Sequence, residues 1–599
     1  MGESNTASTN ISVSTTMEEK INNVNLDQKE TSVDATKSVD HDLDNKAIRS
    51  KKFKRGMTFL ALQVSLFLGA LDGTIVSTCL PRIGSDFQEF TIASWVATAY
   101  ILTFDAFQPL FAKFSDIFGR KWTLVTGICI FLLGSLLCGV AKSMIMLIIC
   151  RAIAGIGSAG IFSGVFIIIS EIVPLEKRGN YQGLINAVFA LASVFGPLIG
   201  GGFTDNLTWR WSFYINLPIG GIALLLLILF LDMPTQKSSF VDKLKRIDYI
   251  GTFIVLVAAI LFLLALNFGG EIFPWKSAAV IVPLVLTFLL ACLFPVIESR
   301  FAREPILPPR LFKNRSVVSI LITNWWFGLN FFAIVYYLPV YFQVVKGDSA
   351  MWSGIRLIPM QMLICVGSTS VGFLITKTGA YRPFIWFGTS IMTMHVGLIS
   401  LFDVNTDFSM IYGITVVGGL GIGCMFSSTI IGLQAAVEPK DIAVVTGLGN
   451  FSRLLGAAVG IAIASSVLNS GLNERLPNLI PPEYISPVIK SSLFVRDGLP
   501  VQYQAVTLQA YADSLRLIWY IMIPLIALGI LSSAFIKHYD LRRPGQKKQK
   551  QEEQPEKSTD EKNGDEVVVE LPLPAAMESS SKVEIAETLD QENDKKPSN

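Results

Sequence analysis

The run MIMLIICRAIAGIGSAGIFSGVFIIIS, residues 144–170, decides the fold class of this 599-residue chain. It contains one charged residue, Arg151, and it exceeds the roughly 20 apolar residues that a helix needs to cross a bilayer. Similar runs recur from Met57 to Ile536, separated by short polar breaks. Because 51% of the residues are hydrophobic and 16% are charged, one soluble core cannot bury them all. The sequence predicts an all-α protein that crosses a membrane many times.

Fourteen stretches have the length and composition of a membrane span. The first follows a polar segment that is too long for a cleaved signal peptide, so we expect this span to serve as the targeting signal. The predicted spans are 57–79, 95–114, 122–141, 144–170, 181–203, 212–231, 248–268, 277–298, 317–343, 353–376, 382–402, 408–434, 443–468 and 515–536.

Basic residues favour one orientation of these spans. If the N-terminus is cytosolic, the cytosolic connections carry most of the Lys and Arg residues and the opposite connections carry few, which is the usual bias of membrane proteins. Both tails, 1–56 and 537–599, are then cytosolic, and their polar composition predicts disorder. The connection from about Asn469 to Ser514 would lie on the opposite side.

The chain also resembles itself. At an offset of 264 residues glycines of the fourth and fifth spans match glycines of the twelfth and thirteenth, and at 260 residues the loop at 112–119 matches 372–379. We interpret spans 1–6 and 9–14 as two copies of one unit, which predicts bundles at 57–232 and 317–536 and an inserted helix pair with cytosolic linkers at 233–316. The alternative is that glycine-rich helices match by composition alone. The matched glycines are Gly155 with Gly419, Gly183 with Gly447, and Gly196 with Gly460.

Five local motifs accompany this repeat. They are Leu71-Asp72-Gly-Thr74-Ile-Val, Asp116-Ile-Phe-Gly119-Arg120-Lys121, Arg151 with Gly155, Gly196-Pro197-Leu-Ile-Gly200-Gly201, and Trp209-Arg210-Trp211 through Asn216-Leu217-Pro218.

Together these motifs resemble those of the major facilitator superfamily, and within it the fourteen-spanner drug:proton antiporters of bacteria and fungi. The resemblance covers about residues 57–536 and is nearest to the fungal multidrug and vacuolar basic amino-acid transporter type. It implies two pseudo-symmetric six-helix bundles plus two inserted helices, with a solute site between bundles that rock by alternating access. Three residues depart from the family pattern, namely Ala112, Ala154 and Ala192.

Two charges lie deep in the predicted membrane region. Asp72 in span 1 and Arg151 in span 4 both fall in the outer half of the bilayer, where an unpaired charge costs about 2.5–3.5 kcal/mol or more. If spans 1 and 4 adjoin, as in the resembled fold, the two side chains interact. A carboxylate whose proton affinity responds to a cation is the minimum for proton coupling. The alternative is a static buried pair.

Three further polar residues are candidates for the solute or for a second proton. Asp105 lies near the centre of span 2, where related chains more often have a small polar residue. Arg453 in span 13 is a candidate contact for an anion or a partner for a carboxylate, and Asn186 in span 5 is a candidate for the cavity. A polar residue that merely faces water remains the alternative for Asp105.

The remaining motifs predict conformational roles. Asp116, Gly119, Arg120 and Lys121 would form a charged latch at the cytosolic ends of spans 2 and 3, with ordinary positive-inside residues as the alternative. Small residues at 196, 200 and 201 and the proline between them would give span 5 a face for close helix contact, which the resemblance assigns to exporters. The motif residues are Gly196, Pro197, Gly200 and Gly201.

The sequence argues against other classes of function. No G-x-x-x-x-G-K-[ST] string occurs, and three histidines give no cluster typical of an enzyme, so we expect no ATPase, no catalytic site, no cofactor and no metal. We expect a monomeric, proton-coupled exporter of a small organic solute in the lipid bilayer, without nucleic acid as a partner. Basic amino-acid import into the vacuole remains open, as do the plasma or vacuolar membrane as its location and a transporter-like receptor or nutrient sensor.

Overall fold

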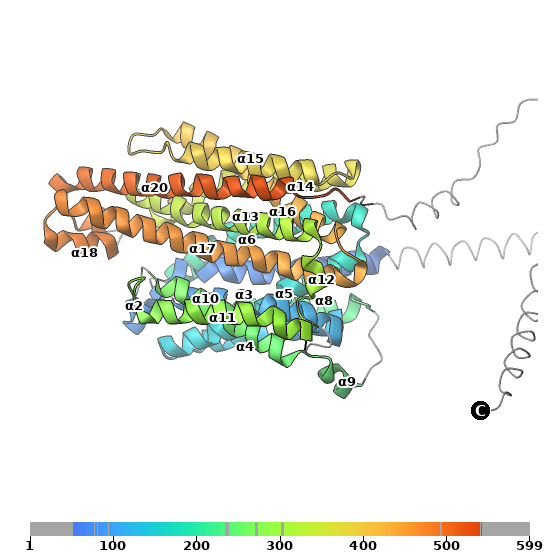
Figure 1. Ribbon diagram of the computed structural model, residues 1–599. Coiled ribbons are helices and arrows are strands. Elements are labelled where there is room, and N and C mark those ends of the chain that lie inside the picture. Colours follow the sequence, from blue (N-terminus) through green and yellow to red (C-terminus); the bar gives the residue numbers. More distant parts are fainter. Residues whose placement is uncertain are drawn as a thin grey trace, which may run out of the picture. The chain divides into compact units, whose positions relative to one another are not determined.

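The structure, a computed structural model, is built from helices (Figure 1). The tails predicted to be disordered, 1–56 and 537–599, lie almost wholly outside the described residues, so their state stays a prediction. Within the described part, the one isolated β-bridge joins Gly269 and Phe273. The described residues are 52–76, 78–80, 82–84, 86–93, 95–233, 239–269, 273–300, 305–490, 494–539 and 541.

Each of the fourteen stretches predicted as spans coincides with a long helix. The N-terminal six are Lys52–Val76, α3 (Trp95–Phe118), α4 (Arg120–Gly139), α5 (Met144–Ile172), α6 (Arg178–Asn206) and α8 (Asn216–Phe230). The inserted pair is α10 (Tyr249–Phe268) and α11 (Ala278–Arg300). The C-terminal six are α13 (Arg315–Val340), α14 (Ala350–Thr378), α15 (Arg382–Ile399), α16 (Phe408–Ala435), α17 (Ile442–Arg475) and α20 (Val501–Ala534).

Short helices connect these long ones. Single turns at 175–177, 439–441 and 476–478 are 3₁₀-helical, and residues 341–345 form a π-helical turn. The short α-helices are α2 (Phe90–Ala93), α7 (Trp211–Tyr214), α9 (Phe240–Lys245), α12 (Pro309–Phe312), α18 (Pro482–Lys490) and α19 (Phe494–Asp497).

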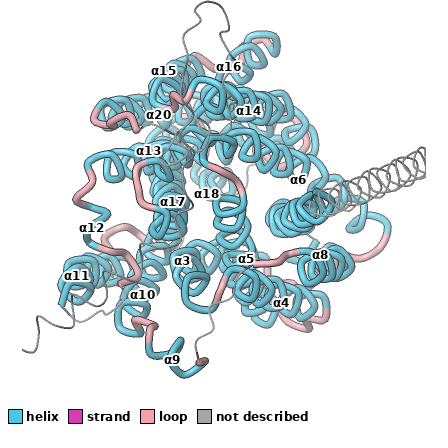
Figure 2. Tube along the Cα trace, turned by 90° about the vertical axis from the view of Figure 1, so that its right-hand side faces the viewer, coloured by secondary structure: helices cyan, strands magenta, loops and turns pink. Residues whose placement is uncertain are grey.

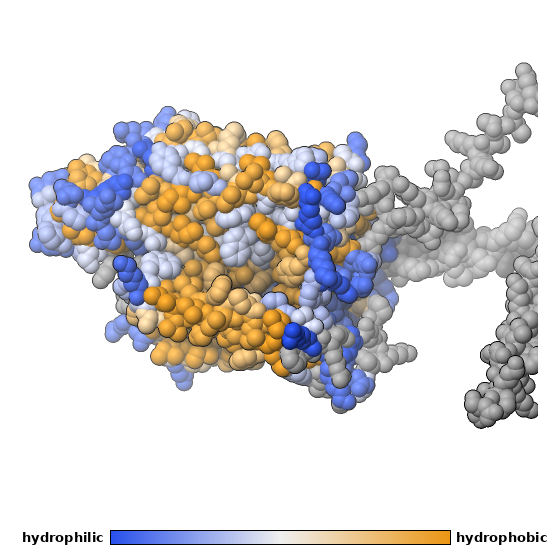
Figure 3. All heavy atoms as spheres, viewed as in Figure 1, coloured by the Kyte–Doolittle hydropathy of each residue, from blue (hydrophilic) through white to orange (hydrophobic). Residues whose placement is uncertain are grey.

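Twelve helices of the described part are long and apolar enough to cross a membrane. The two predicted spans outside this set are α3 and α15. Polar side chains dilute their apolar runs, for example Asp105 and Gln108 in α3 and His395 in α15. The number fourteen therefore stays a prediction, although the all-α polytopic fold is confirmed. Apolar residues form a belt over the middle of the helices, and hydrophilic residues gather at both ends (Figure 3).

The last two long helices extend further than the sequence predicts. Residues 469–475 continue α17, and α20 begins at Val501 instead of near 515. Each helix has 34 residues and is therefore about 50 Å long, against roughly 30 Å of hydrocarbon. Polar and charged residues in these extensions are compatible with a helix in water, so a hydropathy criterion underestimates the helix length.

The internal repeat is visible in the packing. A methyl group added to Gly155 in α5 would overlap the Tyr100 carbonyl, and one added to Gly419 in α16 would lie 2.5 Å from the Met360 carbonyl oxygen. Gly155 and Gly419 are 264 residues apart, and Tyr100 and Met360 are 260 apart. The same contact therefore recurs at both offsets, as the predicted repeat of two six-helix units requires.

The two bundles meet along two seams related by this repeat. In one seam α3 packs against α17, and in the other α14 packs against α6 (Figure 2). Ala112 of α3 clusters with Ala443 of α17 in the first seam, and Gly372 approaches Gly179 backbone to backbone in the second. Both contacts lie at the helix ends near Lys121, Lys177 and Lys377, which we call the basic end.

The inserted pair lies beside the bundles, as Figure 2 shows near α3. Helix α10 contacts α3 and α17, and the Trp95 and Phe268 rings are 5.6 Å apart. Helix α11 packs mainly on α10, and most of its side chains are exposed or partly exposed. Where the chain divides between bundles and insertion, at 232 and 316, stays a prediction.

Candidate functional site

Asp72 and Arg151 lie side by side inside the N-terminal bundle. Arg151 Nη1 of α5 is 2.6 Å from Asp72 Oδ2 of the Lys52–Val76 helix, and both side chains are buried. Arg151 Nε donates to the Val96 carbonyl at 3.1 Å, and its guanidinium stacks on Tyr100, 4.1 Å from the ring centre. The aromatic ring and the carbonyl hold the cation in place, so the carboxylate faces a fixed charge.

A third residue completes this network. Asn216 Nδ2, at the start of α8, donates to Asp72 Oδ1 and to Ser135 Oγ, both at 2.9 Å. Ser135 of α4 in turn donates to the Phe213 carbonyl at 2.9 Å. Both carboxylate oxygens of Asp72 therefore have donors. The sequence singled out Asn216 only as part of a motif, because no spacing rule connects residues 72 and 216.

Asp105 is buried in a different way. Its side chain in α3 is 1% exposed, and neither carboxylate oxygen has a hydrogen-bond partner among the described residues. Gln108 is also buried, and its Oε1 atom lacks a partner there too. Asp105, Gln108 and Ala112 share one helix face by their spacing, and Ala112 faces Gly447 of α17. Helix α3 thus presents an uncompensated carboxylate toward the seam with the second bundle.

The other two solute candidates form no described hydrogen bond with Asp105. Arg453 of α17 donates through Nη2 to Asn450 at 2.9 Å and lies over the Phe426 ring, while its Nη1 atom has no partner in the described part. Asn186 of α6 is buried, and its Nδ2 atom likewise lacks a described partner. Arg453 forms no described ion pair with a carboxylate. Three buried polar groups on α3, α6 and α17 thus have unused hydrogen-bonding capacity.

The predicted latch residues form a charge cluster at the basic end. Arg120 is 2.5 Å from Asp116 and 2.5 Å from Glu171, which joins the ends of α3, α4 and α5. Gly119 has φ +99°, a conformation that favours glycine, and it is the N-cap residue directly before α4. Lys121 donates to the Ile228 carbonyl of α8 at 2.9 Å. Sequence reasoning missed Glu171, which lies 51 residues from Arg120.

The glycine motif of α6 packs on the helix that carries Asp72. A methyl group at Gly196 would overlap the Thr74 side chain, and one at Gly200 would lie 2.5 Å from the Ile75 carbonyl oxygen. Thr74 donates to the Ala192 carbonyl at 3.0 Å. Gly201 has no neighbour within 4 Å of such a methyl group, so it lies outside this contact. Pro197 lies within α6, and its side chain is outside the description.

One polar contact across the bundles had no signal in the sequence. Arg178, at the start of α6, donates to Gln434 of α16 at 2.9 Å. Gln434 donates in turn to Thr446 of α17 at 3.1 Å. Thr369 of α14 donates to the Gly183 carbonyl of α6 at 3.2 Å. With the glycine contact at 179 and 372, these bonds connect the two bundles at the basic end.

Long apolar helices in two packed bundles, with buried charges between them, are typical of a polytopic membrane protein. Residues 62–461 match the model of the Major Facilitator Superfamily. The chain is 37% identical over 487 residues to the MFS-type efflux pump MFS1 of Arthroderma benhamiae, covering 80% of this chain and 90% of that protein. It is 34% identical over 504 residues to the efflux pump FUS6 of Gibberella fujikuroi, covering 82% of this chain and 91% of that protein.

The chain belongs to the major facilitator superfamily, and its relatives over most of its length include fungal efflux pumps. A bacterial homolog of the human lysosomal transporter Spinster has a similar fold. The TM-score is 0.50 at 17% identity, with 82% of this chain and 99% of that chain covered. At this identity the likeness concerns the fold alone.

Proposed function

We propose that this transporter exports a small organic solute from the cytosol in exchange for protons, by alternating access. The relatives named as efflux pumps support the direction of transport. The observation on which proton coupling rests is the buried Asp72–Arg151 pair with its Asn216 donor. A carboxylate between a fixed cation and an amide changes its interactions when it takes up a proton, because the ion pair is lost.

A continuous set of contacts runs from this pair to the seam between the bundles. Thr74, two residues after Asp72, bonds to α6 and packs on Gly196. The other end of α6 carries Gly179, which contacts Gly372 of the second bundle. Protonation of Asp72 would release Arg151 and let the first helix shift, and α6 would transmit this shift to the seam. Opening the basic end would then require breaking the glycine contact.

Asp105, Arg453 and Asn186 are the groups we assign to the solute or to a second proton. A cationic solute or a proton would compensate the charge of Asp105, and an anionic or hydrogen-bonding group would use the free atoms of Arg453 and Asn186. Asp116, Arg120 and Lys121 would hold the helix ends of the first bundle while it moves. In this proposal the basic end faces the cytosol, and the plasma membrane is the location, with the vacuolar membrane as the alternative.

Flux in sealed vesicles tests the proposal. Vesicles that contain the wild type should accumulate ethidium against its gradient when a pH gradient is imposed, and the ethidium movement should change the internal pH. Asp72→Asn keeps the size and hydrogen bonding of the side chain but cannot ionise, so this coupling should be lost. Full coupling in Asp72→Asn, with loss of coupling in Asp105→Asn, would contradict the assignment.

Free arginine, tested as a second transport substrate in the same vesicles, addresses the alternative of basic amino-acid import into the vacuole. Proton-coupled arginine uptake without ethidium uptake would replace drug export by basic amino-acid transport. If neither probe moves although the protein is folded, a receptor or sensor function is favoured.

A further inference from the structure

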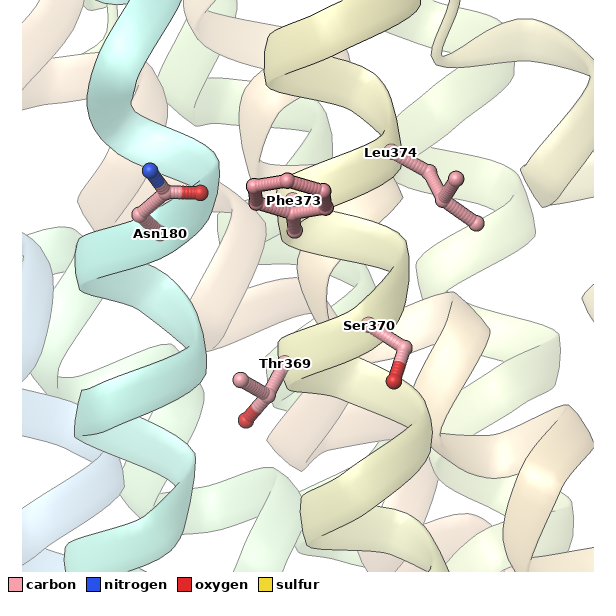
Figure 4. Close-up of a pocket in the computed structure, with 5 residues that line it drawn as sticks. All are labelled: Asn180, Thr369, Ser370, Phe373 and Leu374. Atoms are coloured by element: carbon pink, nitrogen blue, oxygen red, sulfur yellow. The ribbon is translucent and has the colours of Figure 1, made fainter.

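A crevice of about 490 Å³ lies between α6 and α14 near the basic end. Figure 4 shows Asn180 on α6 and the other lining residues on α14, with the Phe373 ring between the two helices in this view. The crevice therefore involves both bundles, directly beside the contact of Gly179 with Gly372. The residues from α14 are Thr369, Ser370, Phe373 and Leu374.

The crevice lies on an exposed, apolar side of α14. Met362, Val366, Phe373 and Leu374 lie along one side of α14, and they are 40–57% exposed. The opposite side of this helix is buried against α16, where Gly423 approaches the backbone of Ser368. Exposed apolar residues in a row on a long membrane helix are expected to contact acyl chains.

The rim of the crevice is polar and basic. Asn180 and Ser370 are exposed, although they stand among lipid-facing apolar residues. Lys177 ends the 3₁₀ turn that leads into α6, three residues before Asn180, and Lys377 lies in the last turn of α14, four residues after Phe373, so both lysines are near the crevice along the chain. Both lysines are exposed at the basic end. Two cations above an apolar groove complement a molecule with an anionic head and hydrocarbon tails.

We propose that this crevice binds an anionic glycerophospholipid of the leaflet at the basic end. The phosphate would lie at Lys177 and Lys377, the glycerol esters would accept hydrogen bonds from Asn180 and Ser370, and one acyl chain would follow Phe373 and Leu374. Because the lipid contacts one helix of each bundle beside the closed seam, it stabilises the arrangement in which the basic end is closed. The site is independent of the proton and solute sites.

Photo-crosslinking tests the binding. The full-length transporter is reconstituted in phosphatidylcholine nanodiscs with a trace of photoactivatable phosphatidylserine or photoactivatable phosphatidylcholine, and the labelled peptides are mapped. Phosphatidylserine should label α14 around residues 370–374 preferentially. Lys177→Gln with Lys377→Gln should reduce this labelling roughly tenfold, whereas Lys313→Gln, an exposed lysine elsewhere, should not. Soluble glycerophosphate should fail to compete; competition would indicate a phosphate site instead of a lipid site.

A second experiment measures the consequence for the seam. Spin labels replace Trp122 of the first bundle and Lys440 of the second, both exposed, in a cysteine-free background. Phosphatidylserine should increase the population with the short distance, and Ser370→Trp, which fills the crevice, should make the distances independent of lipid charge. Equal labelling by both lipids, or distances that ignore phosphatidylserine in the wild type, would overturn the proposal whether or not the protein transports ethidium.

Discussion

Asp72 and Asp105 are aspartates of the same bundle, and both are almost completely buried, yet their surroundings are opposite. Asp72 accepts hydrogen bonds from Arg151 and Asn216, whereas neither oxygen of Asp105 has a partner in the described part. Burial alone therefore does not indicate what a membrane carboxylate does. The oxygens of Asp72 are paired with side chains of the fold, while those of Asp105 are left without a described partner, which is what the proposed solute or proton site would require.

Arg151→Ala should have the largest effect on stability, because it removes the cation that distinguishes Asp72 from Asp105. Removing the cation leaves Asp72 charged and buried, which costs about 3–5 kcal/mol of stability. Thermal unfolding in detergent, monitored by size-exclusion chromatography, should show a large decrease in the unfolding temperature. Adding Asp72→Asn to this variant should recover much of the stability without recovering ethidium transport. If the double variant is no more stable than Arg151→Ala, the charge of Asp72 is not the cause.

Asn216→Ala should have an intermediate effect. It removes one donor to a charged group, a change worth about 1.5–3 kcal/mol. The same unfolding assay measures it, and Asn267→Ala is the matched control because the described hydrogen bond of Asn267 goes to the Leu263 carbonyl of its own helix. Equal losses in the two variants would mean that Asn216 contributes nothing particular to the pair.

Asp105→Leu should increase the stability of the protein, in contrast to the two preceding variants. Since Asp105 makes no described hydrogen bond, replacing it with an apolar residue should stabilise the protein by about 1 kcal/mol. Transport of ethidium should nevertheless be lost. Destabilisation similar to that of Asn216→Ala would show that Asp105 has a partner in the folded protein, and the contrast with Asp72 would disappear.

The smallest effect concerns a carboxylate outside the membrane, Asp403. Burial acts to raise its pKa, but hydrogen bonds from Val404 and Gln509 together with Arg516 outweigh burial and lower it. A lowered pKa in the folded state means that the stabilisation is present at neutral pH and is lost as the pH falls through the folded value. Asp403→Asn should therefore unfold at a slightly lower temperature at pH 7, and the difference should narrow below about pH 4. A difference that persists in acid would exclude this cause.

The sequence predicts the architecture well for reasons specific to membranes. Long apolar runs locate the helices, and the glycine pairs at a constant offset, such as Gly155 and Gly419, locate the two bundles. The depth of Asp72 and Arg151 in their spans, with the fold implied by the resemblance, was enough to expect their contact. These features depend on composition and position along the chain.

The remaining contacts depend on how helices rotate and cross. Asn216 reaches Asp72 only because α8 returns beside α4, and Arg178 reaches Gln434 over a separation of 256 residues. Helix spacing places Asp105 and Gln108 on one face, but it does not indicate which helix covers that face. Single-sequence reasoning cannot supply these rotations, because side-chain packing determines them.

The contact between Gly179 and Gly372 also bears on how this transporter can change by mutation. Every possible replacement at either position adds atoms where two backbones already touch. Small stepwise changes in side-chain size, which can adjust other helix contacts during evolution, are therefore not available at the contact of Gly179 with Gly372. The α3–α17 seam, where alanines occupy the equivalent positions, retains that freedom. Among related transporters, substitutions that change how easily the basic end opens should therefore be found more often in the α3–α17 seam than in the α6–α14 seam.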